Sequence, residues 1–140
     1  MDQILEFIGN NLFLTTAFLV VAAMLTYNIY ADIAAGANIG PREVTDLINR
    51  EEATLIDVRP ISDFNKGHIL GAKNIPMSGL MKQLGTLEKH KDQPVIINCR
   101  SGAQSALACK QLRSKGFEKV YNLRGGILAW QSAGMPISKK

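Results

Sequence analysis

The feature that most constrains this chain is an apolar segment near its N-terminus, residues 12–30. A helix of this length rises about 28 Å, close to the ~30 Å hydrocarbon core of a bilayer. Apolar residues occur on all sides of it, so the helix has no polar face for water. Tyr27 and Tyr30 stand near one end, where aromatic rings favour the membrane interface. The segment therefore predicts one transmembrane helix that contacts the lipid bilayer through residues 12–30.

Two other interpretations fit this segment less well. A secretory signal peptide would begin with Lys or Arg, whereas this chain begins with MDQILEFIGN, which has two acids and no base. A buried core helix would need a domain around it, and the roughly 100 remaining residues are too few to enclose so long an apolar helix. A membrane anchor remains the prediction.

Charge divides the chain and predicts its orientation. All 16 basic residues lie at or after Arg42. Only nine of the 12 acidic residues lie in the same part of the chain, so residues 42–140 have a formal charge of +7. Because Lys and Arg near a membrane stay on the cytoplasmic side, we expect the N-terminus outside the cell (inner) membrane and a cytoplasmic soluble domain. The expected organisation is an anchor over residues 1–31, a tether over 32–38 rich in small residues, and one domain over 39–140.

Short apolar runs alternate with helical patterns in the soluble part. Pro41 opens a helix with one apolar face, and strands are expected at residues 53–58, 73–75, 95–99 and 119–123. Further helices are expected at 78–84, at 103–115 before Gly116, and at the GGILAWQSAG stretch. Strands separated by helices imply an α/β domain with a mainly parallel sheet buried on both faces.

The candidate reactive residues lie where the strand VIIN is followed by CRSGAQS and a helix. Ligands of open parallel sheets bind at the carboxyl ends of strands, and Cys99 occupies such a position. The residues after it predict a tight turn whose N–H groups converge, with Gly102 supplying a conformation that other residues resist. Together with the helix N-terminus, this turn favours negative charge on a nucleophilic sulfur.

Several stretches, in the right order, resemble the rhodanese-like domain family. CRSGAQS is similar to the active-site loop of that family, six residues that begin with the cysteine. The other matching stretches are LIDVR (residues 55–59), GHILGAKNIP (67–76), NLRGGILAW (122–130) and GMP (134–136). With its N-terminal anchor, the chain resembles bacterial membrane-bound, single-domain rhodanese-like proteins.

The resemblance implies a rhodanese-like open parallel sheet flanked by helices, and sulfurtransfer. Cys99 would take a sulfane sulfur from a small donor, hold it as a persulfide and pass it to a thiol or cyanide acceptor, with no metal or organic cofactor. The resemblance assigns substrate binding to Arg100, Ser101, Gly102, Ala103 and Gln104. Membrane-protein partners fit the anchor, and no nucleic-acid partner is expected.

Gln104 departs from the family pattern, because many single-domain rhodaneses carry arginine at the sixth loop position. A neutral amide should bind a thiosulfate dianion less well, unless the neighbouring Arg100 compensates. A catalytically weak rhodanese fold that serves as an interaction module beside membrane proteins is therefore the alternative. A cysteine phosphatase is rejected, because Ser105 stands where its Cys-x5-Arg loop needs arginine.

Other notable residues have structural interpretations. Asp57 and Arg59 either support the site or form a structural ion pair. Cys99 and Cys109 are too far apart along the chain's predicted helix for a disulfide, so both are expected to be free thiols, which suits the cytosol. Cys109 is interpreted as a small core residue and Trp130 as core packing.

Overall fold

The computed structural model describes residues 1–35 and 37–139, with the side chains of 32–36 left out of the description. The chain forms two compact units, Met1–Ile33 and Ala34–Lys140. The first holds α1 (Asp2–Asn10) and most of α2 (Leu12–Ala35). The helices of the second unit are α3 (Pro41–Glu51), α4 (Ile61–Lys66), α5 (Leu84–Leu87), α6 (Ala103–Ser114) and α7 (Gly126–Ser132), with 3-10 turns η1 (Met77–Gly79), η2 (Met81–Gln83) and η3 (Glu88–His90). Its strands are β1 (Ala37–Ile39), β2 (Thr54–Asp57), β3 (His68–Ile69), β4 (Lys73–Asn74), β5 (Val95–Asn98), β6 (Val120–Leu123) and β7 (Ile137–Ser138).

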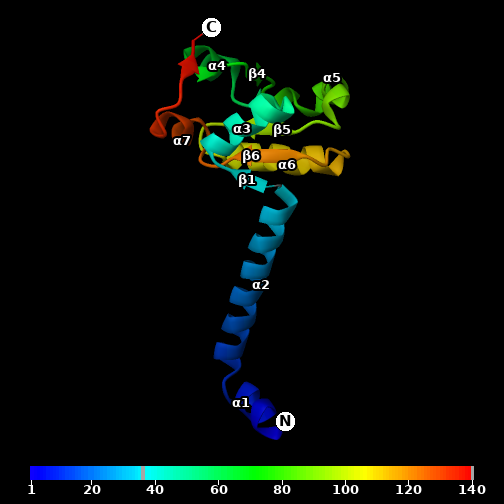
Figure 1. Ribbon diagram of the computed structural model, residues 1–140. Coiled ribbons are helices and arrows are strands. Elements are labelled where there is room, and N and C mark those ends of the chain that lie inside the picture. Colours follow the sequence, from blue (N-terminus) through cyan, green and yellow to red (C-terminus); the bar gives the residue numbers. More distant parts are fainter. Residues whose placement is uncertain (36, 140) are drawn as a thin grey trace. The chain divides into compact units, whose positions relative to one another are not determined.

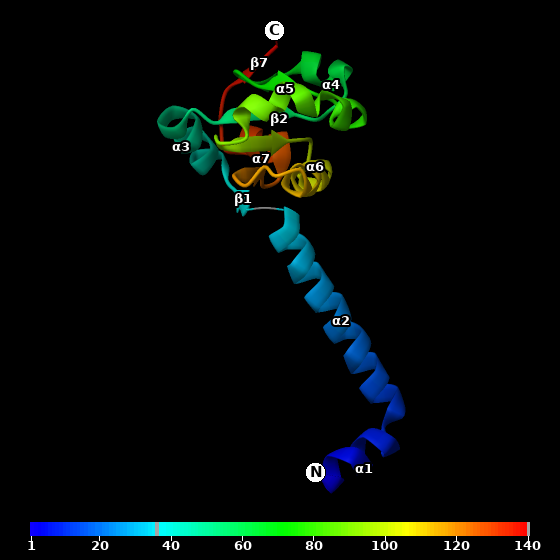
Figure 2. The ribbon, with the colours of Figure 1, turned by 90° about the vertical axis from the view of Figure 1, so that its right-hand side faces the viewer.

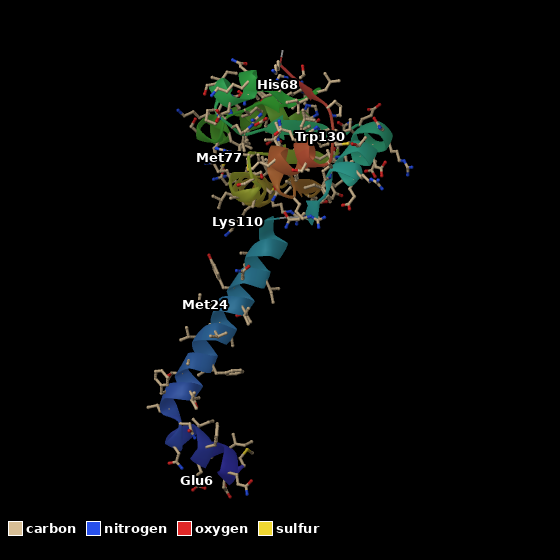
Figure 3. All side chains as sticks on the ribbon, turned by 90° about the vertical axis from the view of Figure 1, so that its left-hand side faces the viewer. Glu6, Met24, His68, Met77, Lys110 and Trp130 are labelled. Carbon is tan, nitrogen blue, oxygen red and sulfur yellow. The ribbon has the colours of Figure 1, made fainter. Side chains whose placement is uncertain are left out.

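The apolar N-terminal segment forms one continuous helix, α2. Its side chains stand out on all sides in Figure 3, where Met24 is labelled, and Met24 is 66% exposed. None of the stretch Leu12–Ala31 is buried by the rest of the protein, and its mean hydropathy is 1.9. By length and composition this stretch is a candidate membrane span, as the sequence predicts for residues 12–30.

A five-stranded sheet organises the second unit, in the order β1-β6-β5-β2-β4. Every neighbouring pair in it is parallel, so the carboxyl ends of the strands meet at one edge. Figure 2 shows α3 on one side of this sheet and α6 on the other. The expected α/β fold with a parallel sheet flanked by helices is confirmed.

Alternating strand residues fill two cores, one on each face of the sheet. Ile56 and Ile97 pack on the face covered by α5 and α6, together with Leu112 and Phe117. Their chain neighbours Leu55 and Ile96 point to the opposite face. There they pack with Val44 of α3, Leu123 of β6 and Trp130 of α7. Because successive strand side chains point to opposite faces, near-continuous apolar strands such as VIIN are what a doubly covered sheet requires.

The structure departs from the sequence expectations in several short elements. Of residues 32–38, expected as a tether, 32–35 continue α2 and 37–38 belong to β1, which pairs with β6, while residue 36 lies outside the described residues. The helix expected over 78–84 is replaced by the turns η1 and η2 followed by α5. Helix α4 and the antiparallel pair β3 and β7 are not predicted by the sequence, because elements of two to six residues carry too little periodicity.

Candidate active site

Cys99 follows the last residue of β5, at the carboxyl edge of the sheet. The loop from Cys99 to Gly102 turns directly into α6, which begins at Ala103 (Figure 1). Gly102 makes this turn with φ of +99°, in the left-handed region that glycine adopts without strain. A Cβ there would also come within 3.3 Å of the Gly125 nitrogen. The turn therefore needs glycine at this position.

The sulfur of Cys99 lies in a polar setting although its residue is buried. The Gly102 N–H donates a hydrogen bond to Sγ at 3.0 Å, and Ser105 Oγ lies 3.2 Å from the same sulfur. Cys99 itself is only 3% exposed. The sulfur thus faces a backbone donor and a hydroxyl, and both can donate to negative charge on it.

A chain of polar side chains runs from Cys99 to the first strand of the domain, through the buried Ser105 and Asn122 to the exposed Asn38. The hydroxyl of Ser105 donates to Oδ1 of Asn122 in β6. The Nδ2 of Asn122 donates in turn to Gly102 O at 3.2 Å and to Asn38 Oδ1 in β1 at 2.9 Å. Because both of these acceptors are oxygens, the orientation of the Asn122 amide is fixed. The strands β5, β6 and β1 are thereby connected beneath the cysteine loop.

The start of α7 closes the other side of the loop. Ile127 N donates to Cys99 O at 2.9 Å, and Leu128 N donates to Arg100 O at 3.3 Å. This close approach is possible because residue 126 is glycine with φ of +59°, and a Cβ there would strike both carbonyl oxygens. The double glycine of NLRGGILAW therefore has a physical role, since it lets a helix N-terminus satisfy the loop carbonyls.

Asp57 and Arg59 form a buried ion pair at the end of β2, the strand beside β5. Arg59 Nη2 lies 2.7 Å from Asp57 Oδ2, and the Arg59 backbone N–H donates to Asp57 Oδ1 at 3.0 Å. The same Nη2 donates to Gly67 O at 2.8 Å. Asp57 is fully buried, so its charge is compensated almost entirely by this one arginine. The guanidinium is held rigidly as a wall of the site.

An open cavity of about 360 Å³, the cysteine cavity, lies against Cys99. Five of the six sequence-predicted loop residues line it, and Gly102 is instead buried beneath the turn. Arg59 lines it as well, whereas its partner Asp57 lies below the surface. The full lining is Arg59, Pro60, Asp63, Cys99, Arg100, Ser101, Ala103 and Gln104.

Cys109 lies away from this cavity, in the core beneath α6. Its residue is fully buried, and burial raises the pKa of its thiol to about 12. Its Sγ lies 3.5 Å from Tyr121 O. Both cysteines are free, as expected, and Cys109 stays protonated at neutral pH as a small core residue. Among the described side chains, those of residues 1–31 and 37–139, there is no group of three or more His, Cys, Asp or Glu that could hold a metal ion.

Sequence reasoning missed Ser105, Asn122 and Asn38 as parts of the site. Ser105 entered only as the residue that excludes a phosphatase loop, and Asn122 only as a letter of a family motif. The available signal was a polar residue inside an otherwise apolar buried element, because such groups need partners. Asn122 in the strand VYNL carries that signal, whereas Ser105 lies in α6, which also bears exposed polar residues such as Gln104 and Lys110.

The chain is similar in sequence and in fold to known proteins. The family model described as Rhodanese-like domain matches residues 40–133. The Escherichia coli (strain K12) protein YibN is 33% identical over 98% of this chain and 97% of its own length. A sulfurtransferase of Allochromatium vinosum is 40% identical over 65% of this chain and 83% of its own. A rhodanese-related protein of Thermoplasma volcanium superposes with a TM-score of 0.67 at 28% identity, over 74% of this chain and 99% of its own.

Proposed function

Because the chain belongs to the rhodanese-like domain family, we propose that it is a membrane-anchored sulfurtransferase that carries a sulfane sulfur on Cys99. The observation that carries this proposal is the environment of the Cys99 sulfur. A backbone N–H at 3.0 Å and a hydroxyl at 3.2 Å face it, beside an open cavity of about 360 Å³. These features suit a nucleophile that must hold negative charge and meet a small substrate.

The first half-reaction loads the cysteine. The Cys99 thiolate attacks the outer sulfur of a sulfane donor, the donor's own sulfur–sulfur bond breaks, and the donor's remainder leaves with the bonding electron pair. For thiosulfate that leaving group is sulfite. The product is a persulfide on Cys99, whose added sulfur lies in the cysteine cavity. Hydrogen bonds from Gly102 and Ser105 stabilise sulfur charge at the base of the cavity.

The second half-reaction empties the cysteine. A thiolate or cyanide attacks the outer sulfur of the persulfide, the bond between the two sulfurs breaks, and Cys99 leaves as a thiolate. The negative charge returns to the same donors, so the loop is ready for another cycle. Arg100, Ser101, Ala103 and Gln104 are the proposed substrate-binding residues, because their side chains line the cavity in which both reactions occur.

The anchor defines where this chemistry takes place. The stretch Leu12–Ala31 is long and apolar enough to span a bilayer, and all 16 basic residues follow it in sequence. These two features support a single-pass protein with its N-terminus outside and its domain in the cytoplasm. Protease added to intact spheroplasts should leave the domain whole and digest it only after lysis. Digestion before lysis would reverse the proposed orientation.

The sulfur-carrying role can be tested by intact mass. Incubation of the detergent-solubilised protein with thiosulfate, and separately with a polysulfide, should add about 32 Da, one sulfur atom. The adduct should disappear in Cys99→Ser and persist in Cys109→Ser. An adduct that survives Cys99→Ser would refute the site. No adduct on the wild-type protein with either donor would favour the interaction-module alternative.

A further inference from the structure

A second cavity of about 210 Å³, the adjoining cavity, opens beside the cysteine cavity. The two share three wall residues, Arg59, Asp63 and Arg100. Beyond these, the adjoining cavity is lined by the apolar residues Ile127 and Leu128 at the start of α7 and Ile137 of β7, and by Lys66, Gly67 and Gln131. The shared walls make the two cavities neighbouring parts of one surface depression.

Size indicates that the adjoining cavity extends the cysteine cavity. Small-molecule sites commonly occupy about 300–1,000 Å³. At about 210 Å³ the adjoining cavity is too small to be such a site alone, whereas the cysteine cavity, at about 360 Å³, lies at the low end of the range. A ligand longer than thiosulfate can place its reacting end at Cys99 and extend its other end into the adjoining cavity.

Charge indicates what that other end carries. The charge of Arg59 is neutralised by the buried Asp57, whose Oδ2 lies 2.7 Å from Arg59 Nη2. Lys66 is paired with Asp63, at 3.9 Å between Lys66 Nζ and Asp63 Oδ1. Among the side chains that the structure describes, those of residues 1–31 and 37–139, no carboxylate lies within ion-pair distance of Arg100, yet Arg100 lines both cavities. It is thus the uncompensated cation where the two cavities meet.

We propose that the adjoining cavity binds the carboxylate-bearing end of the sulfur acceptor, a thiol whose carboxylate lies several bonds from its sulfur. Arg100 pairs with that carboxylate, and the apolar side chains of Ile127 and Leu128 pack against the uncharged middle of the molecule. This inference rests on the proposed sulfurtransferase function and names the class of its acceptor.

The transfer balances without an added oxidant or reductant. The acceptor thiolate attacks the outer sulfur of the Cys99 persulfide, forming its own sulfur–sulfur bond. The bond from that sulfur to Cys99 Sγ breaks, and Cys99 departs as the thiolate. The acceptor leaves as a persulfide, and no electrons are gained or lost overall.

The first test fills the adjoining cavity. Leu128 is 47% exposed, so Leu128→Trp adds bulk there without overpacking the core. Its matched control is Leu107→Trp on α6, at a residue that is 57% exposed and lines neither cavity. The full-length protein in detergent is first loaded with sulfur, and transfer is then followed to glutathione and to cyanide. Leu128→Trp should lower the ratio of glutathione to cyanide transfer about tenfold, and Leu107→Trp should leave that ratio unchanged.

The second test removes the charge from each partner. The wild-type protein should prefer glutathione over its diethyl ester about tenfold, with rates corrected for reaction of the same thiols with a free persulfide. Arg100→Gln should abolish that preference, and Arg50→Gln on α3 should keep it. The acceptor site alone is overturned if Cys99 loads but transfer shows no preference for glutathione over its diethyl ester. The same holds if Leu128→Trp leaves the ratio of glutathione to cyanide transfer unchanged. Failure of Cys99 to load from any sulfane donor would overturn the sulfurtransferase function beneath it.

Discussion

Ser105 Oγ lies 3.2 Å from Cys99 Sγ, and both residues are buried. A serine hydroxyl has one proton to donate, and here it has two competing acceptors besides the sulfur, Asn122 Oδ1 and Gly102 O. When Cys99 carries a negative charge, the strongest of these bonds is the one to sulfur, because charged acceptors attract a proton more than neutral ones do. The hydroxyl is therefore placed to respond to the charge state of the cysteine.

Ser105→Ala should slow persulfide formation on Cys99. Loss of one hydrogen bond to a charged group costs about 1.5–3 kcal/mol, which corresponds to a rate reduction of about ten- to 100-fold. Single-turnover loading followed by quenched mass spectrometry measures this rate. Ser114→Ala, at the exposed end of α6, serves as the control and should load like the wild type. Equal loading in Ser105→Ala would mean that the Gly102 N–H suffices.

Gly126→Ala should destabilise the domain and distort the loop. The added Cβ would meet the carbonyl oxygens of Cys99 and Arg100, at a backbone φ of +59° that alanine resists. Strain of this kind and overpacking each cost about 1–3 kcal/mol. Denaturant unfolding in detergent, followed through the single tryptophan, Trp130, reports the change. Gly85→Ala is the matched control, because a Cβ at Gly85 meets nothing within 4 Å. Equal stability of the two variants would contradict the packing argument.

Arg59→Ala should lower the free energy of unfolding by about 3–5 kcal/mol, because it leaves the Asp57 carboxylate buried without its partner. Lys66→Ala, which removes an exposed pair with a nitrogen–oxygen distance of 3.9 Å, should change it by less than about 1 kcal/mol. Urea unfolding of both variants measures the difference. If Arg59→Ala recovers stability when Asp57→Ala is added, the cost lies in the unpaired carboxylate. If it does not, the bond from Arg59 to Gly67 O carries the effect.

Cys109 should make stability fall at alkaline pH. Burial raises the pKa of its thiol from 9.0 to about 12 in the folded protein. Between these two values the unfolded thiol loses its proton while the folded one keeps it, so the free energy of unfolding falls as pH rises. From pH 9 upward the loss approaches about 1.4 kcal/mol per pH unit. Cys109→Ala should remove this component. An identical slope in both proteins between pH 9 and 10.5 would show that Cys109 does not contribute.

Residue patterns predicted the elements whose apolar pattern extends over several residues. Apolar faces predicted α3 and α6, an apolar run predicted β5, and the carboxyl edge of a parallel sheet predicted where Cys99 would lie. The hydrogen bond between Asn38 and Asn122 joins residues 84 positions apart, and no local pattern encodes such a contact. The adjoining cavity was likewise unpredictable, because it forms only where α4, α7 and β7 meet the cysteine loop.

Gln104→Arg should raise turnover with thiosulfate. Gln104 is exposed and lines the cysteine cavity, so an arginine there places a second uncompensated cation beside Arg100. A charge-assisted hydrogen bond to the dianion contributes about 1.5–3 kcal/mol, so kcat/KM for thiosulfate should rise about tenfold or more. Transfer from an uncharged sulfane donor, such as an organic trisulfide, should not rise in parallel, because that donor presents no anion to the new cation. Lys110→Arg on the outer face of α6 controls for an added guanidinium elsewhere. An equal rise with both donors would mean that residue 104 acts on the reactivity of Cys99, and no rise with either would mean that Arg100 and the loop backbone already satisfy the anion.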